Sequence, residues 1–256
     1  MSGKQQQDAQ EWFIMIVDKL HEAITPESSN RHRCNCFFHK VFFGRHNSEV
    51  TCDKCHSTAT NEEEYSSISL DFKKQIRRKK KQITSETKDT KTTIPSVHEC
   101  LKAYTAPEQL NQEDYRCRSC DAPRSASKRV KIRKLPAILC VHVKRFGMKV
   151  TKDSIVVPEK YDGRIDFPTV LDMEPYTADK PSKNGTVAVG RFMYDLECVV
   201  VHQGDHAHSG HYFAFCREGG RWFRYDDEIV SATTLEDVMR QEAYLLFYSL
   251  RSIGKE

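Results

Sequence analysis

Ser209–Asp227 reads SGHYFAFCREGGRWFRYDD, and this stretch decides how the C-terminal part of the chain folds. Two aromatic-rich runs flank a Gly-Gly step, which is typical of two short antiparallel strands joined by a tight turn. In such a hairpin the start of the first strand lies beside the end of the second. We therefore expect His211 to lie next to Asp226 or Asp227.

A histidine held by a carboxylate is two-thirds of the triad that activates a nucleophile. The alternative is an ordinary hairpin that carries a surface histidine and two solvated aspartates. Side chains alternate between the two faces of a strand, so His211 shares one face with Phe213 and Phe215. Cys216 lies on the other face and is expected to point away from His211.

Composition narrows the class of protein. The chain has 256 residues and 38% hydrophobic content, enough for one large domain or two small ones. No run of residues has the length of a membrane helix, and no signal-peptide segment opens the sequence. The net charge of +4 is mild and does not by itself indicate nucleic-acid binding.

Ten cysteines would suggest disulfides in a small secreted protein, but no secretory signal is present. Several of them stand in Cys-x-x-Cys or Cys-x-Cys steps. This pattern favours reduced cysteines in a cytosolic or nuclear protein, some of them bound to metal.

Two Cys-x-x-Cys steps predict a structural zinc site formed by Cys52, Cys55, Cys117 and Cys120. The 61 residues between the two steps exceed the spacing of a compact zinc finger, so the fold must bring two separate hairpins together. Four thiolates leave no open coordination position, which makes the expected role structural. Unrelated buried cysteines are the alternative.

A second metal site is predicted near the N-terminus, where a Cys-x-Cys step is followed by a histidine and preceded by another at the end of the first helix. The candidate ligands are His21, Cys34, Cys36 and His39. His32 and His56 are rival ligands, and a pair of free thiols is the alternative.

Three helices are predicted. Asp8 and Glu11 form a capping-box-like step before the first, whose apolar residues recur at helical spacing and are expected to face a core: Trp12, Phe13, Ile16, Val17, Leu20 and Ile24. The second starts at Ser96 with Glu99 as its capping partner, and turns inward Cys100, Leu101 and Tyr104. The third spans Leu235–Arg240.

The remaining apolar runs are expected to be strands. They are Lys40–Phe43, Ser67–Phe72, Lys128–Ile132, Ala137–Phe146, Asp195–His202, Tyr212–Cys216, Trp222–Tyr225 and Tyr244–Leu250. Helices come early and strands late, so the predicted fold class is α+β with an antiparallel sheet.

One polar insert, Lys73–Thr93, lacks periodicity and carries a basic cluster at Arg77–Lys81. It cannot bury apolar surface, and we expect a disordered loop. The cluster is either a nuclear-import signal, a patch for an acidic partner, or a solvated loop.

These motifs together resemble the catalytic domain of ubiquitin-specific proteases, which are papain-like cysteine peptidases. The matching segments, in the order of the family, are QQDAQEWF, the two Cys-x-x-Cys steps, LPAILCVHVKRF, SGHYFAFC with WFRYDD, and EAYLLFYSL. Within the family, CNCFFHKVFFG, VTCDKCHS, ISLDF, LDMEPY and YLLFYS are most similar to the histone-deubiquitinating subunits of SAGA-type coactivator complexes.

The resemblance implies one domain over 1–256, with thumb helices, an antiparallel palm and zinc-ribbon fingers. Its expected parts are a thumb remnant (1–30), fingers and palm with the zinc ribbon (31–72 and 100–146), a basic disordered insert (73–95) and a palm with the histidine box (147–256). It also implies roles: His211 as general base and acid, Asp226 as the group that orients the imidazole, and Asp227 as support for water or the oxyanion.

The nucleophile of the family lies in an Asn-x-Cys box that precedes the glutamine-aspartate motif, with which this sequence begins. We therefore expect a truncated deubiquitinase domain without its nucleophile, inactive alone, or a catalytically dead ubiquitin-binding scaffold of the same fold. A zinc-stabilised interaction module without a link to ubiquitin is a third hypothesis. The resemblance implies ubiquitin, ubiquitinated proteins such as histones, and SAGA-type subunits as partners, and a nuclear location. It implies neither membrane nor direct nucleic-acid binding.

Overall fold

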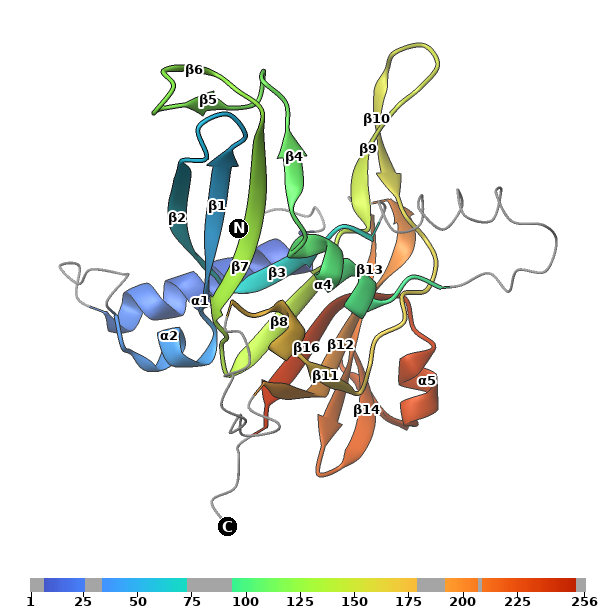
Figure 1. Ribbon diagram of the computed structural model, residues 1–256. Helices are drawn as coiled ribbons and strands as arrows, with labels where there is room; N and C mark the ends of the chain where they lie inside the picture. The colour runs from blue at the N-terminus through green and yellow to red at the C-terminus, as the bar shows by residue number, and fades with distance from the viewer. Residues whose placement is uncertain (1–6, 26–33, 73–93, 179–191, 207–208, 252–256) are drawn as a thin grey trace, which may run out of the picture.

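The computed structural model describes residues 7–25, 34–72, 94–178, 192–206 and 209–251 (Figure 1). Among these residues, no helix is both long and apolar enough to span a membrane. The polar insert Lys73–Thr93, with its basic cluster, and the rival ligand His32 lie outside the described residues.

A large sheet forms the centre of the fold, and it is antiparallel apart from the parallel pair β3 and β8. Its strand order is β15-β14-β13-β12-β16-β8-β3, with β11 paired to β12. The strands are β3 (Ser67–Leu70), β8 (Ile138–Val143), β11 (Val170–Asp172), β12 (Met193–His206), β13 (Ser209–Glu218), β14 (Arg221–Asp226), β15 (Ile229–Thr233) and β16 (Ala243–Leu250). Six of the predicted strand segments lie on this sheet, which confirms the α+β fold class.

One face of the large sheet carries the main hydrophobic core. Val199 and Val201 of β12 and Leu246 and Tyr248 of β16 belong to it, at the alternate positions that a strand turns to one side. The helix α4 (Val97–Tyr104) covers part of this core, and its Ser96–Glu99 capping box is present as predicted.

The helix α1 (Ala9–Ile24) covers the other face, where Phe13 and Val17 pack with Cys140, Tyr244 and Leu245 (Figure 1). Asp8 caps it by accepting hydrogen bonds from the backbone N–H groups of Gln10 (2.7 Å) and Glu11 (3.2 Å). The cap leaves one Asp8 oxygen free to accept the hydroxyl of Tyr244, so the helix end is tied to the sheet.

The expected burial of α1 is wrong for Trp12, Leu20 and Ile24, which are 51%, 46% and 54% exposed. The helix meets the sheet along a single line, because only Phe13, Val17 and His21 are buried on it. Trp12, Leu20 and Ile24 lie on a different line of the helix, offset from the buried one by one position, which is about 100° around the helix axis.

The predicted strand Lys40–Phe43 is also wrong. This segment contains the last two residues of the helix α2 (Phe37–Val41) and the turn that follows the helix. The Cys36 thiol caps α2 by accepting the backbone N–H of His39 at 3.4 Å. Phe38 and Phe42 stack on each other and pack against the α1 cluster, so the apolar spacing is that of a helix. The short helices α5 (Leu235–Met239) and η2 (Glu174–Tyr176) complete the helical elements among the described residues.

A second, four-stranded sheet stands above the large one and forms the fingers, in the order β2-β1-β7-β4 (Figure 1). Its strands are β1 (Gly44–Cys52), β2 (Thr58–Tyr65), β4 (Glu108–Leu110) and β7 (Ala126–Lys134). Two hairpins accompany it, formed by β5 (Arg116–Cys117) with β6 (Ala122–Pro123) and by β9 (Phe146–Val150) with β10 (Val156–Lys160). Of these strands only β7 was predicted, because most side chains of β1 and β2 are polar and at most half-buried.

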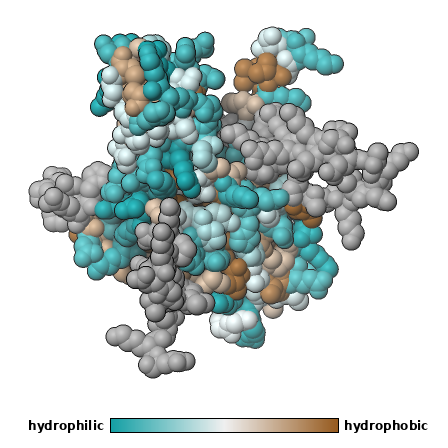
Figure 2. Space-filling view, in the orientation of Figure 1, coloured by the Kyte–Doolittle hydropathy of each residue, from teal (hydrophilic) through white to brown (hydrophobic). Residues whose placement is uncertain are grey.

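Figure 2 shows an apolar patch on the β9–β10 hairpin, below its more polar tip. The exposed apolar residues of this hairpin are Met148, Val150, Ile155 and Val156. At the base of this hairpin Arg145 is buried, and its guanidinium donates to the carbonyl oxygens of Ala243, Tyr161 and Gly163 at 2.8–3.0 Å. Burial lowers the pKa of Arg145 to about 10, and the three carbonyls replace the lost hydration. The arginine thereby links the segment before β9 to the segment after β10 and to the start of β16.

Candidate functional site

The β13–β14 hairpin brings His211 and Asp226 together. In its register Ala214 pairs with Tyr225. Continuing this register by one residue places Asp226 opposite Phe213, and therefore diagonal to His211 on the same face of the sheet. Nε2 of His211 and Oδ1 of Asp226 are hydrogen-bonded, which confirms the predicted contact and the choice of Asp226 as its acceptor.

Arg224 holds the other oxygen of the same carboxylate. Its Nη2 donates to Oδ2 of Asp226 at 2.6 Å, and the guanidinium lies over the ring of Phe213 at 4.4 Å. The hydrogen bond with His211, and then the charge of Arg224, lower the pKa of Asp226. The carboxylate is therefore ionised and fixed on both oxygens at neutral pH. Arg224 stands inside the WFRYDD segment, but no pattern in the sequence predicts its contact with Asp226.

A close approach of two strands explains the glycine before His211. A Cβ atom at Gly210 would lie 2.4 Å from the carbonyl oxygen of Gln203 and 2.5 Å from Nε2 of His202. The register of β12 and β13 shifts at this point. The ammonium group of Lys160 donates hydrogen bonds to the carbonyl oxygens of His202 (3.3 Å) and Gly204 (2.5 Å). Because only glycine fits here, the Gly-His step fixes the position of His211 on β13, where it pairs with Gln203.

Asp227 follows in a tight turn, with φ of +51°. One ligand atom from each of His211, Asp226 and Asp227 lies within 4.8 Å of the others, so the structure brings all three predicted residues together. His211 is 41% exposed and its imidazole is open to a reactant. An imidazole that is held by an ionised carboxylate can accept a proton from a thiol or water and later return it.

The four cysteines of the finger tip converge, as predicted, from two separate hairpins. Cys52 and Cys55 flank the β1–β2 turn, while Cys117 and Cys120 belong to the β5–β6 hairpin. Their sulfur atoms lie within 4.8 Å of one another, and Cys55 and Cys117 are 3.6 Å apart. The set could hold a metal ion, and four thiolates are the donors of structural zinc sites.

Hydrogen bonds give two of these thiols different pKa values. Those from Ser57 and from the backbone of Cys120 lower the pKa of Cys117 to about 6. The hydrogen bond with Cys55, together with burial, raises the pKa of Cys120 to about 11. One thiolate is thus already favoured at neutral pH, and thiolates are the form that binds metal.

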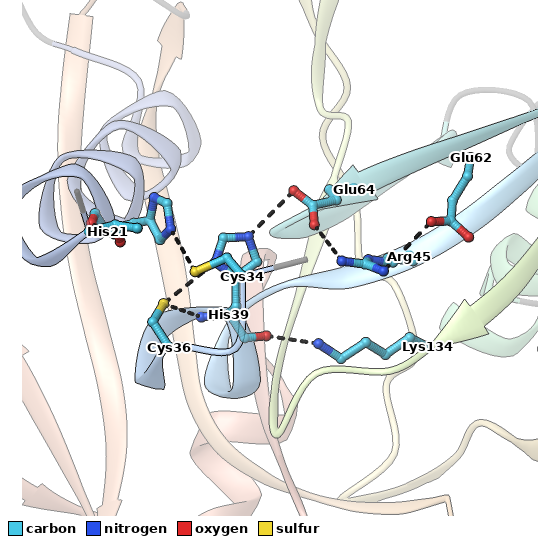
Figure 3. Close-up of polar contacts among 9 residues, drawn as sticks. His21, Cys34, Cys36, His39, Arg45, Glu62, Glu64 and Lys134 are labelled. Atoms are coloured by element: carbon cyan, nitrogen blue, oxygen red, sulfur yellow. Dashed lines mark hydrogen bonds and ion pairs between the residues drawn. The ribbon is translucent and has the colours of Figure 1, made fainter. Parts of the chain in front are cut away.

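A second cluster joins α1 to α2 (Figure 3). Nε2 of His21 lies 3.5 Å from Sγ of Cys34, and Nδ1 of His39 lies 3.5 Å from Sγ of Cys36. The ligand atoms of all four residues lie within 4.8 Å of one another, and both histidines are buried. The predicted set therefore converges, whereas the rival His56 lies in the β1–β2 turn of the fingers.

The surroundings of His39 fit a metal ligand. Its Nδ1 faces the thiols, while its Nε2 lies 3.5 Å from the carboxylate of Glu64 on β2 (Figure 3). Arg45 holds that carboxylate in turn at 3.2 Å. Metal-binding histidines commonly donate their second N–H to a carboxylate, which fixes the tautomer. Glu64 was not predicted, because it lies in a run of three glutamates that no sequence pattern distinguishes.

The other four cysteines lie elsewhere. Cys100 is buried on α4 and Cys140 on β8, and Cys198 and Cys216 contact each other between β12 and β13. In the part of the chain that the structure describes, which includes all ten cysteines, no thiol is hydrogen-bonded to His211.

Comparison with known proteins agrees with this geometry. Residues 1–248 match the family "Ubiquitin carboxyl-terminal hydrolase". The chain is 33% identical to ubiquitin carboxyl-terminal hydrolase 8 of Saccharomyces cerevisiae, over 99% of this chain and 51% of that protein. It is also 33% identical to ubiquitin carboxyl-terminal hydrolase 51 of Mus musculus, over 100% of this chain and 40% of that protein.

Solved structures give the same result. The SAGA Ubp8/Sgf11/Sus1/Sgf73 DUB module bound to ubiquitin aldehyde matches with a TM-score of 0.76 and 32% identity, over 98% of this chain and 51% of that one. A form of that module bound to monoubiquitin matches with a TM-score of 0.74. The chain belongs to the ubiquitin carboxyl-terminal hydrolase family and has the ubiquitin-specific protease fold. It spans about half the length of the first curated relative it matches.

Proposed function

We propose that this chain forms the histidine-bearing part of a thiol-dependent deubiquitinase that removes ubiquitin from the lysines of proteins. The observation that carries the proposal is the hydrogen-bonded pair of His211 and Asp226, in a chain that belongs to the ubiquitin carboxyl-terminal hydrolase family. The domain subdivision given above, with thumb, fingers, palm and insert, is part of this proposal.

In this reaction a thiolate attacks the carbonyl carbon of the last residue of ubiquitin. His211 accepts the thiol proton and later donates a proton to the departing lysine amine. Asp226 holds the imidazole in the tautomer whose free nitrogen faces the thiol, and stabilises the imidazolium that forms. Asp227, at the edge of the same site, supports the attacking water or the oxyanion.

We propose further that the nucleophile is not one of the ten cysteines of this sequence. Six converge in the two clusters that could hold metal, two are buried, and Cys216 contacts Cys198 instead of His211. The same observation favours a second candidate function, a ubiquitin-binding scaffold of this fold without chemistry.

A hydrolysis assay with ubiquitin linked to a fluorophore separates the two. We expect no turnover by the chain alone. Turnover should appear when the chain replaces the matching region of the yeast relative, and His211→Ala should abolish it. If the fusion binds ubiquitin but remains inactive, the scaffold function replaces the deubiquitinase. Turnover by the chain alone that is lost in His211→Ala would contradict the absent nucleophile.

Both cysteine-containing clusters are proposed to hold structural zinc: Cys52, Cys55, Cys117 and Cys120 at the finger tip, and His21, Cys34, Cys36 and His39 at the base of α1. The convergence of soft donors and the Glu64 contact of His39 support this assignment. The zinc ions would cross-link hairpins and helices and take no part in the reaction.

The proposed partners are ubiquitin, ubiquitinated proteins with histones as the candidate substrate, and subunits of a SAGA-type complex, with a nuclear location. The similarity to a SAGA module that contains ubiquitin aldehyde, Sgf11, Sus1 and Sgf73 supports these assignments. Co-purification of the tagged full-length protein with nuclear coactivator subunits tests them, and recovery from cytosol without such subunits would count against them.

A further inference from the structure

Cys198 and Cys216 form a close pair outside the proposed site and outside both metal clusters. They lie directly across from each other in the antiparallel register of β12 and β13, and their sulfur atoms are 3.2 Å apart. Both side chains are partly exposed. Cys216 alternates with Phe215 along β13 and therefore lies on the sheet face opposite to His211.

The backbone geometry suits a covalent bond between the two sulfurs. Directly opposed residues of antiparallel strands have Cα atoms about 4.5–5.5 Å apart. That range lies within the separation of about 4.4–6.8 Å found in disulfides. The sulfurs need to approach by only about 1 Å to reach the S–S bond length of about 2.0 Å.

The two thiols also differ in acidity. The hydrogen bond with Cys198 lowers the pKa of Cys216, whereas the same bond and burial raise the pKa of Cys198. Because the thiolate is the reactive form, Cys216 is the sulfur that an oxidant meets first, with a second thiol already in contact.

We propose that Cys198 and Cys216 are a redox-sensitive modification site that a peroxide converts into a disulfide between β12 and β13. The Cys216 thiolate attacks one peroxide oxygen and the O–O bond breaks. That oxygen stays on the sulfur with its hydrogen as a sulfenic acid, and the other oxygen leaves as hydroxide, which takes up a proton to form water. The Cys198 sulfur then attacks the sulfur of the sulfenic acid, and a second water leaves with the Cys198 proton. Two thiols are oxidised and one peroxide is reduced.

The remaining cysteines are poorer candidates for this chemistry. Burial strongly raises the pKa of Cys140, which keeps it protonated, and Cys100 is buried on α4. The other six converge in the metal clusters. The disulfide would fasten the strand that carries His211 to its neighbour, and the inference does not depend on whether the chain is a deubiquitinase.

Peptide mapping of the peroxide-treated full chain tests the site. Trypsin releases Phe192–Arg217 as one peptide that contains both cysteines and no internal lysine or arginine. After treatment with hydrogen peroxide and alkylation in denaturant, we expect this peptide to lack both alkyl groups and to be lighter by two hydrogen atoms than the reduced form. Dithiothreitol should restore two alkylation sites.

Matched variants complete the test. Cys198→Ala and Cys216→Ser should each prevent the loss of two hydrogen atoms, while Cys100→Ala should leave it unchanged. The oxidised wild-type chain should also melt a few degrees higher than the reduced chain, since the cross-link restrains the unfolded state. If both cysteines are still alkylated at a peroxide concentration that oxidises the methionines, or if either pairs with another cysteine, the proposal is wrong.

Discussion

The carboxylate of Asp226 is shared between an imidazole and a guanidinium, and this contact has a consequence for acid stability. The pKa of Asp226 is lowered in the folded state, so the stabilisation is present above the unfolded pKa of about 4 and is lost as the pH falls through the folded value. We expect the melting temperature of Asp226→Asn to lie below that of the wild type at pH 7, with a gap that closes below about pH 4. Thermal melts over this range measure it. Asp227→Asn is the matched control, and a pH-independent gap for Asp226→Asn would contradict the ionic contribution.

Gly210 is fixed by space. A methyl group would meet the Gln203 carbonyl and the buried ring of His202, neither of which can move without disturbing the bulge in β12. Gly210→Ala should therefore destabilise the fold by about 2 kcal/mol, as overpacking of a close contact does. Urea unfolding measures the change. Gly219→Asn is the control, because nothing lies within 4 Å of its Cβ position and asparagine tolerates the left-handed backbone. Equal losses in both variants would show that the close approach is not the cause.

At the scale of single elements, the finger hairpins are expected to depend on metal. β5 and β6 are two residues each, too short to be stable alone, and their link to the β1–β2 turn is the cysteine cluster. Cys52→Ser should lower the bound zinc by about one ion per chain and reduce stability by several kcal/mol. Metal analysis with thermal melts checks both. Cys216→Ser should keep the full zinc content, and an unchanged zinc content in Cys52→Ser would exclude the four-cysteine site.

Glu64 belongs to β2 but acts on the cluster between α1 and α2. Its contact with Nε2 of His39 orients the ring, so Glu64→Gln should weaken zinc binding at that cluster by about 10–100-fold. Competition with a zinc chelator of known affinity measures the loss. Glu62→Gln is the control, because Glu62 lies on the same strand as Glu64 and also forms an ion pair with Arg45, at 3.6 Å. If the two variants release zinc alike, the Glu64 contact has no bearing on the metal.

On the scale of the whole molecule, the two sheets differ in what holds them. The large sheet carries the main core on one face and the α1 cluster on the other, whereas most side chains of β1 and β2 in the fingers are polar and at most half-buried. Removing zinc should therefore raise amide hydrogen exchange in β1, β2 and β7 and leave β12 and β16 protected. Exchange followed by mass spectrometry with and without chelator measures this. Equal deprotection of both sheets would mean that the fold unfolds as one unit.

The sequence by itself determined those features whose cause is local. The Gly-Gly turn and the strand alternation place Asp226 beside His211, and the Ser96–Glu99 pair starts α4 where predicted. The Cys-x-x-Cys steps identified both halves of the finger cluster, because two thiols at that spacing can bind the same metal ion. Periodicity also revealed most of the central strands, whose side chains alternate into a core.

Only the tertiary structure decided the rest. It exposed Trp12, Leu20 and Ile24, because which apolar face of a helix is covered depends on where the sheet lies. It brought Glu64 into contact with His39, and Arg224 into contact with Asp226. Both contacts depend on how the strands are arranged, and no pattern in the sequence predicts them. The Cys198–Cys216 contact follows from the register of two long strands, and register depends on how bulges and turns add up across a sheet.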